Sequence, residues 1–263
     1  MNIVRHEVSW YVEKIKKGEP FSIGMYGDGE WQCIFNKAFN DGFRENCEGT
    51  TYTKELSESM LGSLKFNEPN FYFATSGMLW DGDFKRYGKL IDKLTNIEFH
   101  EKGVWNEAMY KCELYEFIKE ARNHNVCIVG NKNLKKLTFL KYKKFIEVGY
   151  PNCYGEMDRA IRECLDYGSP GIYIFACGIP ATLFVQKLHN KIKDSWFLDT
   201  GSIWDTFVGI GGQRATRREL YQNPEQWKEW RDNTLKDIYW SIKELPMINW
   251  YGMGSKEIYQ QLN

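Results

Sequence analysis

Two carboxylates that could bind a metal ion, Asp28 and Glu30, lie in the stretch Gly27-Asp28-Gly29-Glu30. The residues before it, 21–26, have the apolar composition of a buried strand. Alternate residues of an extended segment point to the same side, so both carboxylates can reach one divalent cation, which prefers oxygen ligands shared with substrate phosphates. Equally, Asp28 can cap a helix that begins near Trp31, with Glu30 as a first-turn acid favoured by the helix dipole. The tetrapeptide alone leaves both interpretations open.

The segments that would position these carboxylates alternate between strand-like and helix-like patterns. Apolar, β-branched and aromatic runs predict strands over 21–26, 70–75, 126–129, 145–148, 171–176 and 196–199. Amphipathic patterns predict helices over 4–17, 54–65, 84–94, 106–123, 155–165 and 181–191. Strands that are apolar throughout are typical of a parallel sheet covered on both faces. The predicted fold class is therefore α/β, with a Rossmann-like open, mostly parallel sheet flanked by helices.

The strand pattern stops after about Trp204, and residues 223–245 have the pattern of one or two amphipathic helices. No repeat or Pro/Ser-rich linker divides the chain. We therefore expect an α/β core over 1–210 and a helical C-terminal extension over 211–263 packed on the same domain, with 40–52 as a long loop near the end of the first strand. The aromatic residues of the extension would form either a packed cap or a homodimer face; they are Trp227, Trp230, Tyr239 and Trp240.

The composition excludes several classes of protein. Basic and acidic residues both number 35, so no net charge attracts nucleic acid or an anionic membrane. Seven cysteines without metal-ligand spacing are typical of a reduced, cytoplasmic protein. The N-terminus lacks the apolar run of a signal peptide, and no stretch has 18 uncharged apolar residues, so we expect a cytoplasmic protein without a membrane span.

Glycines with small or polar residues follow most of the predicted strands, and ligands of open α/β sheets bind at the carboxyl ends of the strands. Gly130-Asn131 and the turn from Gly178 to Thr182 carry no acid. They suit phosphate, because glycine lets the backbone approach a ligand and a helix N-terminus offers N–H groups. The turns that start at Gly27, Ser76 and Asp199 are acidic and suit a cation or sugar hydroxyls. This mixture favours a diphosphate bound with a metal.

Four stretches of the chain together resemble the GT-D type glycosyltransferases, a family first catalogued as a domain of unknown function. The stretches are FSIGMYGDGEWQCI, NCEGTTYTKEL, GIYIFACGIPATLFVQKL and SWFLDTGSIWD. The resemblance covers most of residues 20–210 and implies a GT-D-like fold. The chain departs from the family pattern at Met25, where the family is expected to have arginine, and at Ser202, where histidine is frequent.

The resemblance implies roles for individual residues. Asp28 and Glu30 are similar to the family's metal pair and would hold Mn²⁺ or Mg²⁺ on the donor diphosphate. Asp199 resembles an acid that orients sugar hydroxyls or acts as general base, with Asp205 and the pair Asp81 and Asp83 as rival bases. Together with the glycine turns, it predicts the following donor-binding residues: Gly27, Gly29, Gly130, Asn131, Gly178, Ala181 and Thr182.

Arginines and aromatic rings provide further candidates. Arg214, with Arg217 and Arg218, could close over a donor diphosphate or form a solvated basic face. Three tryptophans near predicted turns could stack on an acceptor sugar or base; they are Trp80, Trp105 and Trp204. The four histidines are scattered, and Cys177 has no recognisable partner, so neither type indicates a hydrolase site.

The predicted function is that of a metal-dependent glycosyltransferase. The resemblance implies transfer of a hexose, such as glucose from UDP-glucose, to a hydroxyl of a glycan or glycoprotein, by an inverting displacement. A modified nucleobase in DNA is a less favoured acceptor because the chain has no net positive charge. Two alternatives stay open. The same acids and Mg²⁺ serve phosphoryl or nucleotidyl transfer or phosphoester hydrolysis, and an α/β module could bind a nucleotide sugar without turnover.

Overall fold

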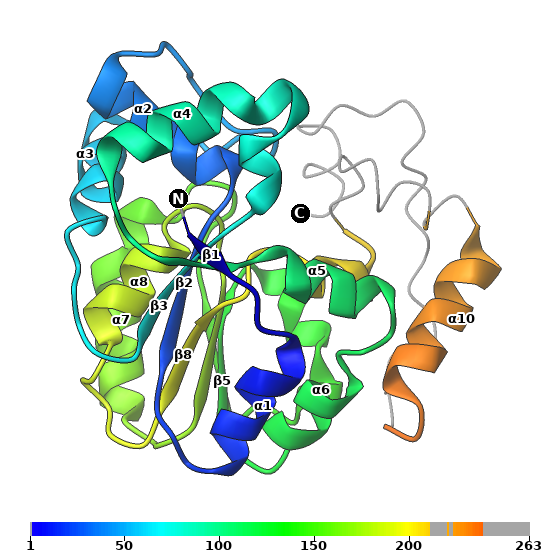
Figure 1. The fold of residues 1–263 in the computed structure, drawn as a ribbon. Helices are drawn as coiled ribbons and strands as arrows, with labels where there is room; N and C mark the ends of the chain where they lie inside the picture. The colour runs from blue at the N-terminus through cyan, green and yellow to red at the C-terminus, as the bar shows by residue number, and fades with distance from the viewer. Residues whose placement is uncertain (1, 211–219, 221–222, 239–263) are drawn as a thin grey trace.

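Eight strands form one parallel sheet in the order β1-β4-β3-β2-β8-β7-β5-β6 (Figure 1). The structure, a computed structural model, describes residues 2–210, 220 and 223–238. The strands are β1 (Ile3–Val4), β2 (Ser22–Tyr26), β3 (Phe71–Thr75), β4 (Phe99–Glu101), β5 (Val126–Gly130), β6 (Lys144–Glu147), β7 (Ile172–Ala176) and β8 (Trp196–Asp199). The predicted parallel α/β sheet is confirmed.

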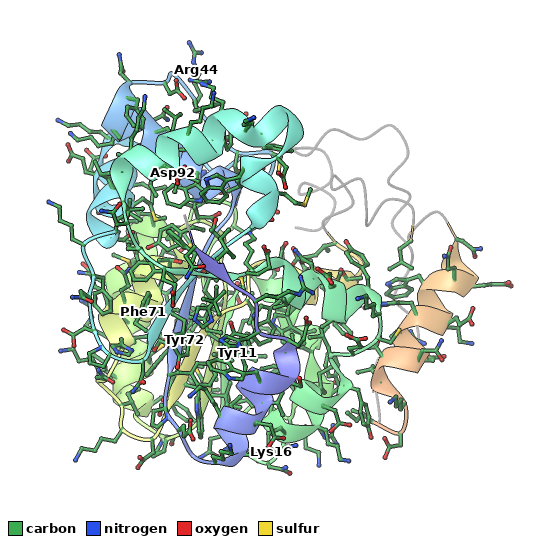
Figure 2. The ribbon with its side chains drawn as sticks, viewed as in Figure 1. Tyr11, Lys16, Arg44, Phe71, Tyr72 and Asp92 are labelled. Carbon is green, nitrogen blue, oxygen red and sulfur yellow. The ribbon has the colours of Figure 1, made fainter. Side chains whose placement is uncertain are left out.

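Helices cover both faces of this sheet (Figure 1). On one face lie α1 (Val8–Lys16), α5 (Gly103–Tyr110), α6 (Tyr115–Ala121) and the 3₁₀ segment η6 (Ile203–Val208). On the other lie α2 (Asp28–Phe39), α3 (Lys54–Ser63), α4 (Lys85–Leu94), α7 (Met157–Tyr167) and α8 (Ala181–Leu188). Successive strand residues alternate between the faces. Tyr72 packs with Tyr11 of α1, the two rings 6.5 Å apart, whereas Phe71 faces the other layer (Figure 2).

Neighbouring strands in the middle of the sheet send the chain to opposite faces. After β2 the chain enters α2 on one face, and after its neighbour β8 it enters η6 on the other. Trp31 of α2 and Trp204 of η6 are each fully buried in these separate layers. Such a reversal opens a crevice at the carboxyl edge of a parallel sheet, which is where ligands of this fold class bind.

Several element boundaries differ from the sequence expectation. The predicted helix over 4–17 begins only at Val8, because Ile3 and Val4 pair with β4 at the sheet edge. The predicted helix over 106–123 is two helices, α5 and α6, separated by a turn in which Cys112 has a φ of 61°. The short strands β1 and β4, at one end of the sheet, were both missed because two or three residues are too few for an apolar run to stand out.

The C-terminal helix α10 (Pro224–Leu235) packs on the α5–η6 side of the core through two tryptophans. Trp227 and Trp230 are buried, and their indole N–H groups donate to the carbonyl oxygens of Thr206 (2.9 Å) and Met109 (2.8 Å). For these two residues the structure supports the packed cap rather than a dimer face. Tyr239 and Trp240 lie outside the described residues.

The cysteines agree with the predicted reduced core. All seven are free, and five are buried in the described structure. Within the described residues there is no helix whose length and apolar character would let it cross a membrane.

Two glycines should respond to the same substitution with opposite signs. A Cβ on Gly171 would lie 2.1 Å from the carbonyl oxygen of Asn125, whereas one on Gly62, exposed in α3, would meet nothing within 4 Å. We expect Gly171→Ala to lower the free energy of unfolding by roughly 2–4 kcal/mol and Gly62→Ala to raise it by about 0.5–1 kcal/mol. Urea denaturation measures both, and equal effects at the two sites would contradict the close approach of Gly171 to the Asn125 carbonyl group.

Candidate functional site

A cavity that is open to solvent lies at the carboxyl edge of the sheet. Its walls come from the residues that follow β2, β4, β5, β7 and β8, together with the loop 40–53. It therefore occupies the crevice that the reversal between β2 and β8 creates. Of the predicted site residues, the following line it: Asp28, Gly29, Glu30, Asn131, Gly178, Asp199 and Asp205.

The proposed metal pair lies in the first turn of a helix, not in an extended segment. Helix α2 begins at Asp28, with Gly27 as its N-cap residue, so the expected start near Trp31 is wrong. Glu30 turns back toward the chain end, and its Oε2 accepts a hydrogen bond from the Gly27 N–H at 2.7 Å. Asp28 is exposed at the first helical position. Glu30 is thus the first-turn acid of the alternative interpretation, although both carboxylates still face one cavity.

Burial raises the pKa of Glu30 above its usual value; nearby Lys102 lowers it and Asp28 raises it further. An acid held this way binds a proton or a cation more readily than one in water. Glu30 is therefore the carboxylate of the pair whose charge most needs compensation.

Asp199 at the end of β8 is a buried carboxylate with three protein donors. Its Oδ2 accepts from the Met25 N–H (3.1 Å) and the Thr182 hydroxyl (2.9 Å), and its Oδ1 accepts from the Gly201 N–H (3.0 Å). Burial, followed by the charge of Glu30, raises the pKa of Asp199 to about 7, although these hydrogen bonds lower it. The residue thus joins β2, α8 and the turn after β8 at the base of the cavity.

Thr182, Ala181 and two of the predicted glycines, Gly27 and Gly130, do not line the cavity. The Thr182 hydroxyl is fully buried and donates to Asp199 and to the Met25 carbonyl oxygen. It therefore links α8 to β8 and β2, and does not face the cavity where it was predicted to contact phosphate. The Ala181 N–H donates to the Gly178 carbonyl oxygen at 2.9 Å. Gly130 allows close strand packing, since a Cβ there would lie 2.9 Å from the Ala176 carbonyl oxygen.

Gly178 and Asn131 form the wall that carries no acid. Gly178 has a φ of +74°, which favours glycine, and a Cβ there would approach the Thr50 hydroxyl. The Asn131 Oδ1 accepts from the Asn133 N–H at 3.0 Å, and its side chain caps the 3₁₀ segment after β5. These residues keep the polar, glycine-bearing character expected of a phosphate wall.

The alternative general bases differ in their position relative to the cavity. Asp205, in η6, is buried and lines the cavity, whereas Asp81 is exposed and does not. Of Asp83 only the backbone is described, in the 3₁₀ segment η2 (Gly82–Phe84). Arg214, Arg217 and Arg218 lie outside the described residues.

The tryptophans do not offer the free rings expected for stacking. Trp204 is fully buried and donates to the Thr200 hydroxyl at 3.0 Å. Trp105 lines the cavity but is 1% exposed, packed between Tyr11 and Phe117. Trp80 packs against Gly88 and donates to Asp92.

The stretch 40–52, expected to be a long loop near the end of the first strand, lies in the loop 40–53 between α2 and α3. This loop forms one side of the cavity through Asn46, Cys47 and Glu48. Its Thr50 hydroxyl donates to the Pro151 carbonyl oxygen (3.0 Å), and the Thr51 N–H donates to the Asn152 side chain (2.9 Å). The loop after α2 thereby reaches the loop after β6, across the carboxyl edge of the sheet.

Lys102 is a cavity residue that the sequence interpretation missed. It follows β4 directly, and the short strand itself was missed. Recognising the run Phe99 to Glu101 before Lys102-Gly103 as a strand end would have found it. Among the described residues that line the cavity, five are acidic and Lys102 is the one basic residue.

Comparisons with solved structures identify the class of fold. No protein-family model matches the sequence, and no curated protein matches it significantly. Three solved structures do match, each over 84% of this chain. One is described as the highly conserved domain of unknown function 1792 with a distinct glycosyltransferase fold (12% identity, TM-score 0.61, 82% of that chain).

The second is described as a new glycosyltransferase, DUF1792, from Streptococcus sanguinis (10% identity, TM-score 0.62, 85% of that chain). The third is a selenomethionine-substituted structure of the same domain of unknown function (13% identity, TM-score 0.59, 82% of that chain). The expected likeness in fold is therefore confirmed: this chain has the fold that the first of these structures describes as a glycosyltransferase fold.

The raised pKa of Asp199 has a consequence for stability. Unfolded Asp199 releases its proton near pH 3.8 and the native residue near pH 7, so between these values the native state binds more protons and loses stability as the pH rises. Asp199→Asn cannot titrate. The advantage of the wild type over Asp199→Asn in free energy of unfolding should fall by about 1.4 kcal/mol per pH unit in this window and level off above it.

Urea denaturation at several pH values measures this difference. The Asn variant should be the less stable at acidic pH, because its amide brings a donor to a site that already has three. An advantage of the wild type that grows with pH would show that the native state prefers ionised Asp199.

Proposed function

We propose that this protein is a glycosyltransferase that uses a nucleotide-sugar donor. The observation that carries the proposal is the meeting of the acids after β2, the buried acid after β8 and the glycine turn after β7 in one cavity at the carboxyl edge of the sheet. The fold shared with the glycosyltransferase-fold structures supports it. A hexose from a UDP-type donor such as UDP-glucose, passed to a hydroxyl of a glycan or glycoprotein, is the specific reaction that we propose.

The donor set of the cavity fits a divalent cation. Five carboxylates against one ammonium make the described lining strongly acidic, and an anionic diphosphate needs positive charge to enter it. The described residues hold no preformed cluster of three ligands. Asp28 and Glu30 would therefore hold Mn²⁺ or Mg²⁺ in part, with phosphate oxygens as the remaining ligands. Such an ion would supply Lewis-acid stabilisation of the leaving diphosphate.

Asp199 and Asp205 are the two candidates for the general base that takes the proton of the acceptor hydroxyl. Asp199 has a pKa of about 7, close to the value that suits a general base at neutral pH. Its oxygens, however, accept three protein hydrogen bonds. Asp205 lines the same cavity from η6. We propose that one of the two is the base, with Asp199 also orienting the site.

Product analysis tests the reaction class. With radiolabelled UDP-glucose, the label should enter an acceptor or appear as free sugar while UDP is released. Cleavage of the diphosphate by water to UMP and glucose 1-phosphate, with the label still on a phosphate, would instead support a phosphoesterase, which the same acids could serve. A DNA acceptor carrying modified bases belongs in the same screen as glycans and glycoproteins.

Substitution of the acid pair separates an enzyme from a binding module. We expect Asp28→Asn and Glu30→Gln each to lower turnover roughly 10²-fold or more, because the cation that they would hold stabilises the leaving group by several kcal/mol. Asp81→Asn is the matched control, since Asp81 is exposed at a strand end outside the cavity. A protein that binds the donor but shows no turnover, with or without these substitutions, would be a non-catalytic module.

A thermal-shift experiment tests the metal directly. A ligand at a hundred times its dissociation constant stabilises the native state by about 2.7 kcal/mol. UDP-glucose with Mn²⁺ should raise the melting temperature more than either alone, and the Asp28→Asn variant should lose this extra shift. If UDP-glucose raised the melting temperature by the same amount in excess chelator as with Mn²⁺, the metal-binding role proposed for Asp28 and Glu30 would be contradicted.

A further inference from the structure

Besides the proposed divalent cation, the acid pair has a positively charged side chain beside it, that of Lys102 on the segment that joins β4 to α5. The Lys102 ammonium rests against Gly27: a Cβ on Gly27 would lie 2.4 Å from Lys102 Nζ and 2.9 Å from Glu30 Oε2. Only glycine leaves room for both atoms. The ammonium therefore occupies the space beside the start of α2, where the helix N-terminus and Glu30 meet.

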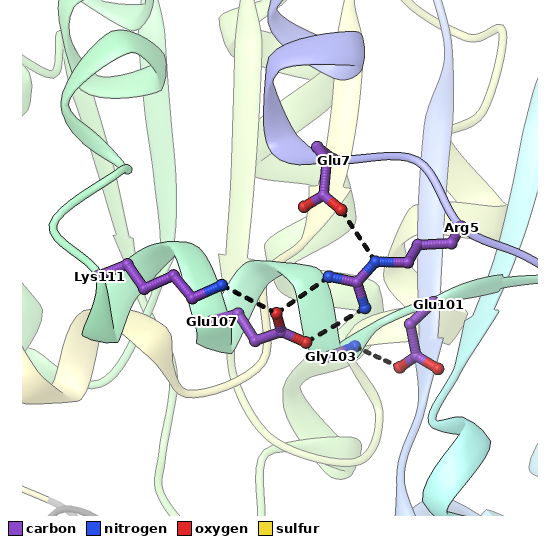
Figure 3. A network of polar contacts seen from close by, with 6 residues as sticks. All are labelled: Arg5, Glu7, Glu101, Gly103, Glu107 and Lys111. Atoms are coloured by element: carbon purple, nitrogen blue, oxygen red, sulfur yellow. Dashed lines mark hydrogen bonds and ion pairs between the residues drawn. The ribbon is translucent and has the colours of Figure 1, made fainter.

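The backbone around Lys102 is fixed by its neighbours. The carboxylate of Glu101 accepts from the Gly77 N–H (2.8 Å) and the Gly103 N–H (2.7 Å), and the second of these contacts is drawn in Figure 3. The Lys102 N–H donates to the Thr75 carbonyl oxygen at 2.9 Å. Glu101 and Lys102 are thus held to the residues at the end of β3, and Gly103 is held to Glu101.

Buried Thr75 connects the same position to helix α2. Its hydroxyl donates to the Tyr26 carbonyl oxygen (2.7 Å) and accepts from the Trp31 indole N–H (3.0 Å). Thr75 therefore spans from Lys102 on one side to the end of β2 and the first turns of α2 on the other. The backbone of Lys102 is therefore placed next to the start of α2 by hydrogen bonds, and its side chain extends from this fixed position.

The ammonium has no hydrogen-bond or ion-pair partner among the residues that the structure describes. Two other cations near α5 are paired: Arg5 and Lys111 both contact Glu107 of α5, as Figure 3 shows. A half-buried ammonium in an acid-lined cavity without a direct partner has its hydrogen-bond donors available for a ligand. Its charge suits an anion, and strong hydrogen bonds from ammonium groups go to phosphate oxygens.

We propose that Lys102 binds the diphosphate of the nucleotide-sugar donor, as a fixed positive charge beside the divalent cation held by Asp28 and Glu30. This rests on the proposed function. It assigns Gly27 the role of making space for the ammonium, in place of direct donor contact. It also assigns the wall after β4 to the phosphates, although that segment was not predicted to belong to the site.

Lys102→Met tests the proposal, because methionine keeps most of the stem and removes the charge. UDP binding, measured by isothermal titration calorimetry with Mn²⁺ present, should weaken about ten- to a hundredfold. Binding of uridine, which has no phosphate, should not change. Mn²⁺ binding without nucleotide should stay equal or tighten, because the substitution removes a positive charge near Glu30.

Lys111→Met is the matched control: Lys111 is an exposed lysine that caps the far end of α5 and contacts Glu107 at 3.4 Å. It should bind UDP as the wild type does. Gly27→Ala is the second variant. It keeps every charge but pushes the ammonium away from α2, and it should also weaken UDP more than uridine.

The outcomes separate this inference from the proposed function. Failure of the wild type to bind UDP or any nucleotide sugar would overturn both. Wild-type binding that Lys102→Met and Gly27→Ala leave unchanged would overturn the role of Lys102 alone. Equal losses of UDP and Mn²⁺ binding in Lys102→Met would show that the lysine acts only by holding the acid pair, which also contradicts phosphate contact.

Discussion

The hydrogen bonds to the buried carboxylate of Asp199 hold together the part of the sheet on which the cavity depends. Its two oxygens accept from the backbone after β8, from the backbone of β2 and from a side chain of α8. The β2 segment is far in sequence from the other two: Met25 lies 174 residues before Asp199, whereas Thr182 lies only 17 residues before it. A buried charge is costly unless it is fully hydrogen-bonded, so this carboxylate specifies one relative placement of the segments. The cavity has a defined base because that placement is fixed.

An excess of acid follows from the same architecture. Parallel strands end at one edge, and the chain puts carboxylates after β2 and β8 and in the loop 40–53. Like charges brought together in a half-enclosed space raise one another's pKa and attract cations. The raised pKa values of Glu30 and Asp199, each partly caused by a neighbouring carboxylate, are the sign of this crowding. An acidic cavity of this kind suits a phosphate ligand only when cations enter with it.

Much of this arrangement could be predicted from the sequence, and the features that could not be predicted have identifiable physical reasons. The central strands are apolar throughout, so their ends, and with them Asp28, Gly178 and Asp199, could be located. The start of α2 could not, because acids that directly follow glycines fit an extended turn and a helix cap equally well. Hydroxyl partners such as that of Thr182 depend on contacts 17 and 157 residues away. No local pattern records these.

Lys102 shows why a short strand away from the centre of a sheet matters for a site at the centre. β4 does not touch β2, since β3 lies between them. Lys102, directly after β4, nevertheless lies beside the start of α2. The reason is that Thr75, at the end of β3, hydrogen-bonds to Lys102 on one side and to Tyr26 and Trp31 on the other. The three-residue strand β4 buries Phe99 fully and is kept in place by backbone pairing and by the Glu101 carboxylate. It therefore packs in the core and also positions the residue that follows it. A charge on such a strand can face the cavity without a loop that must be ordered first, and this lowers the entropy lost when a ligand binds.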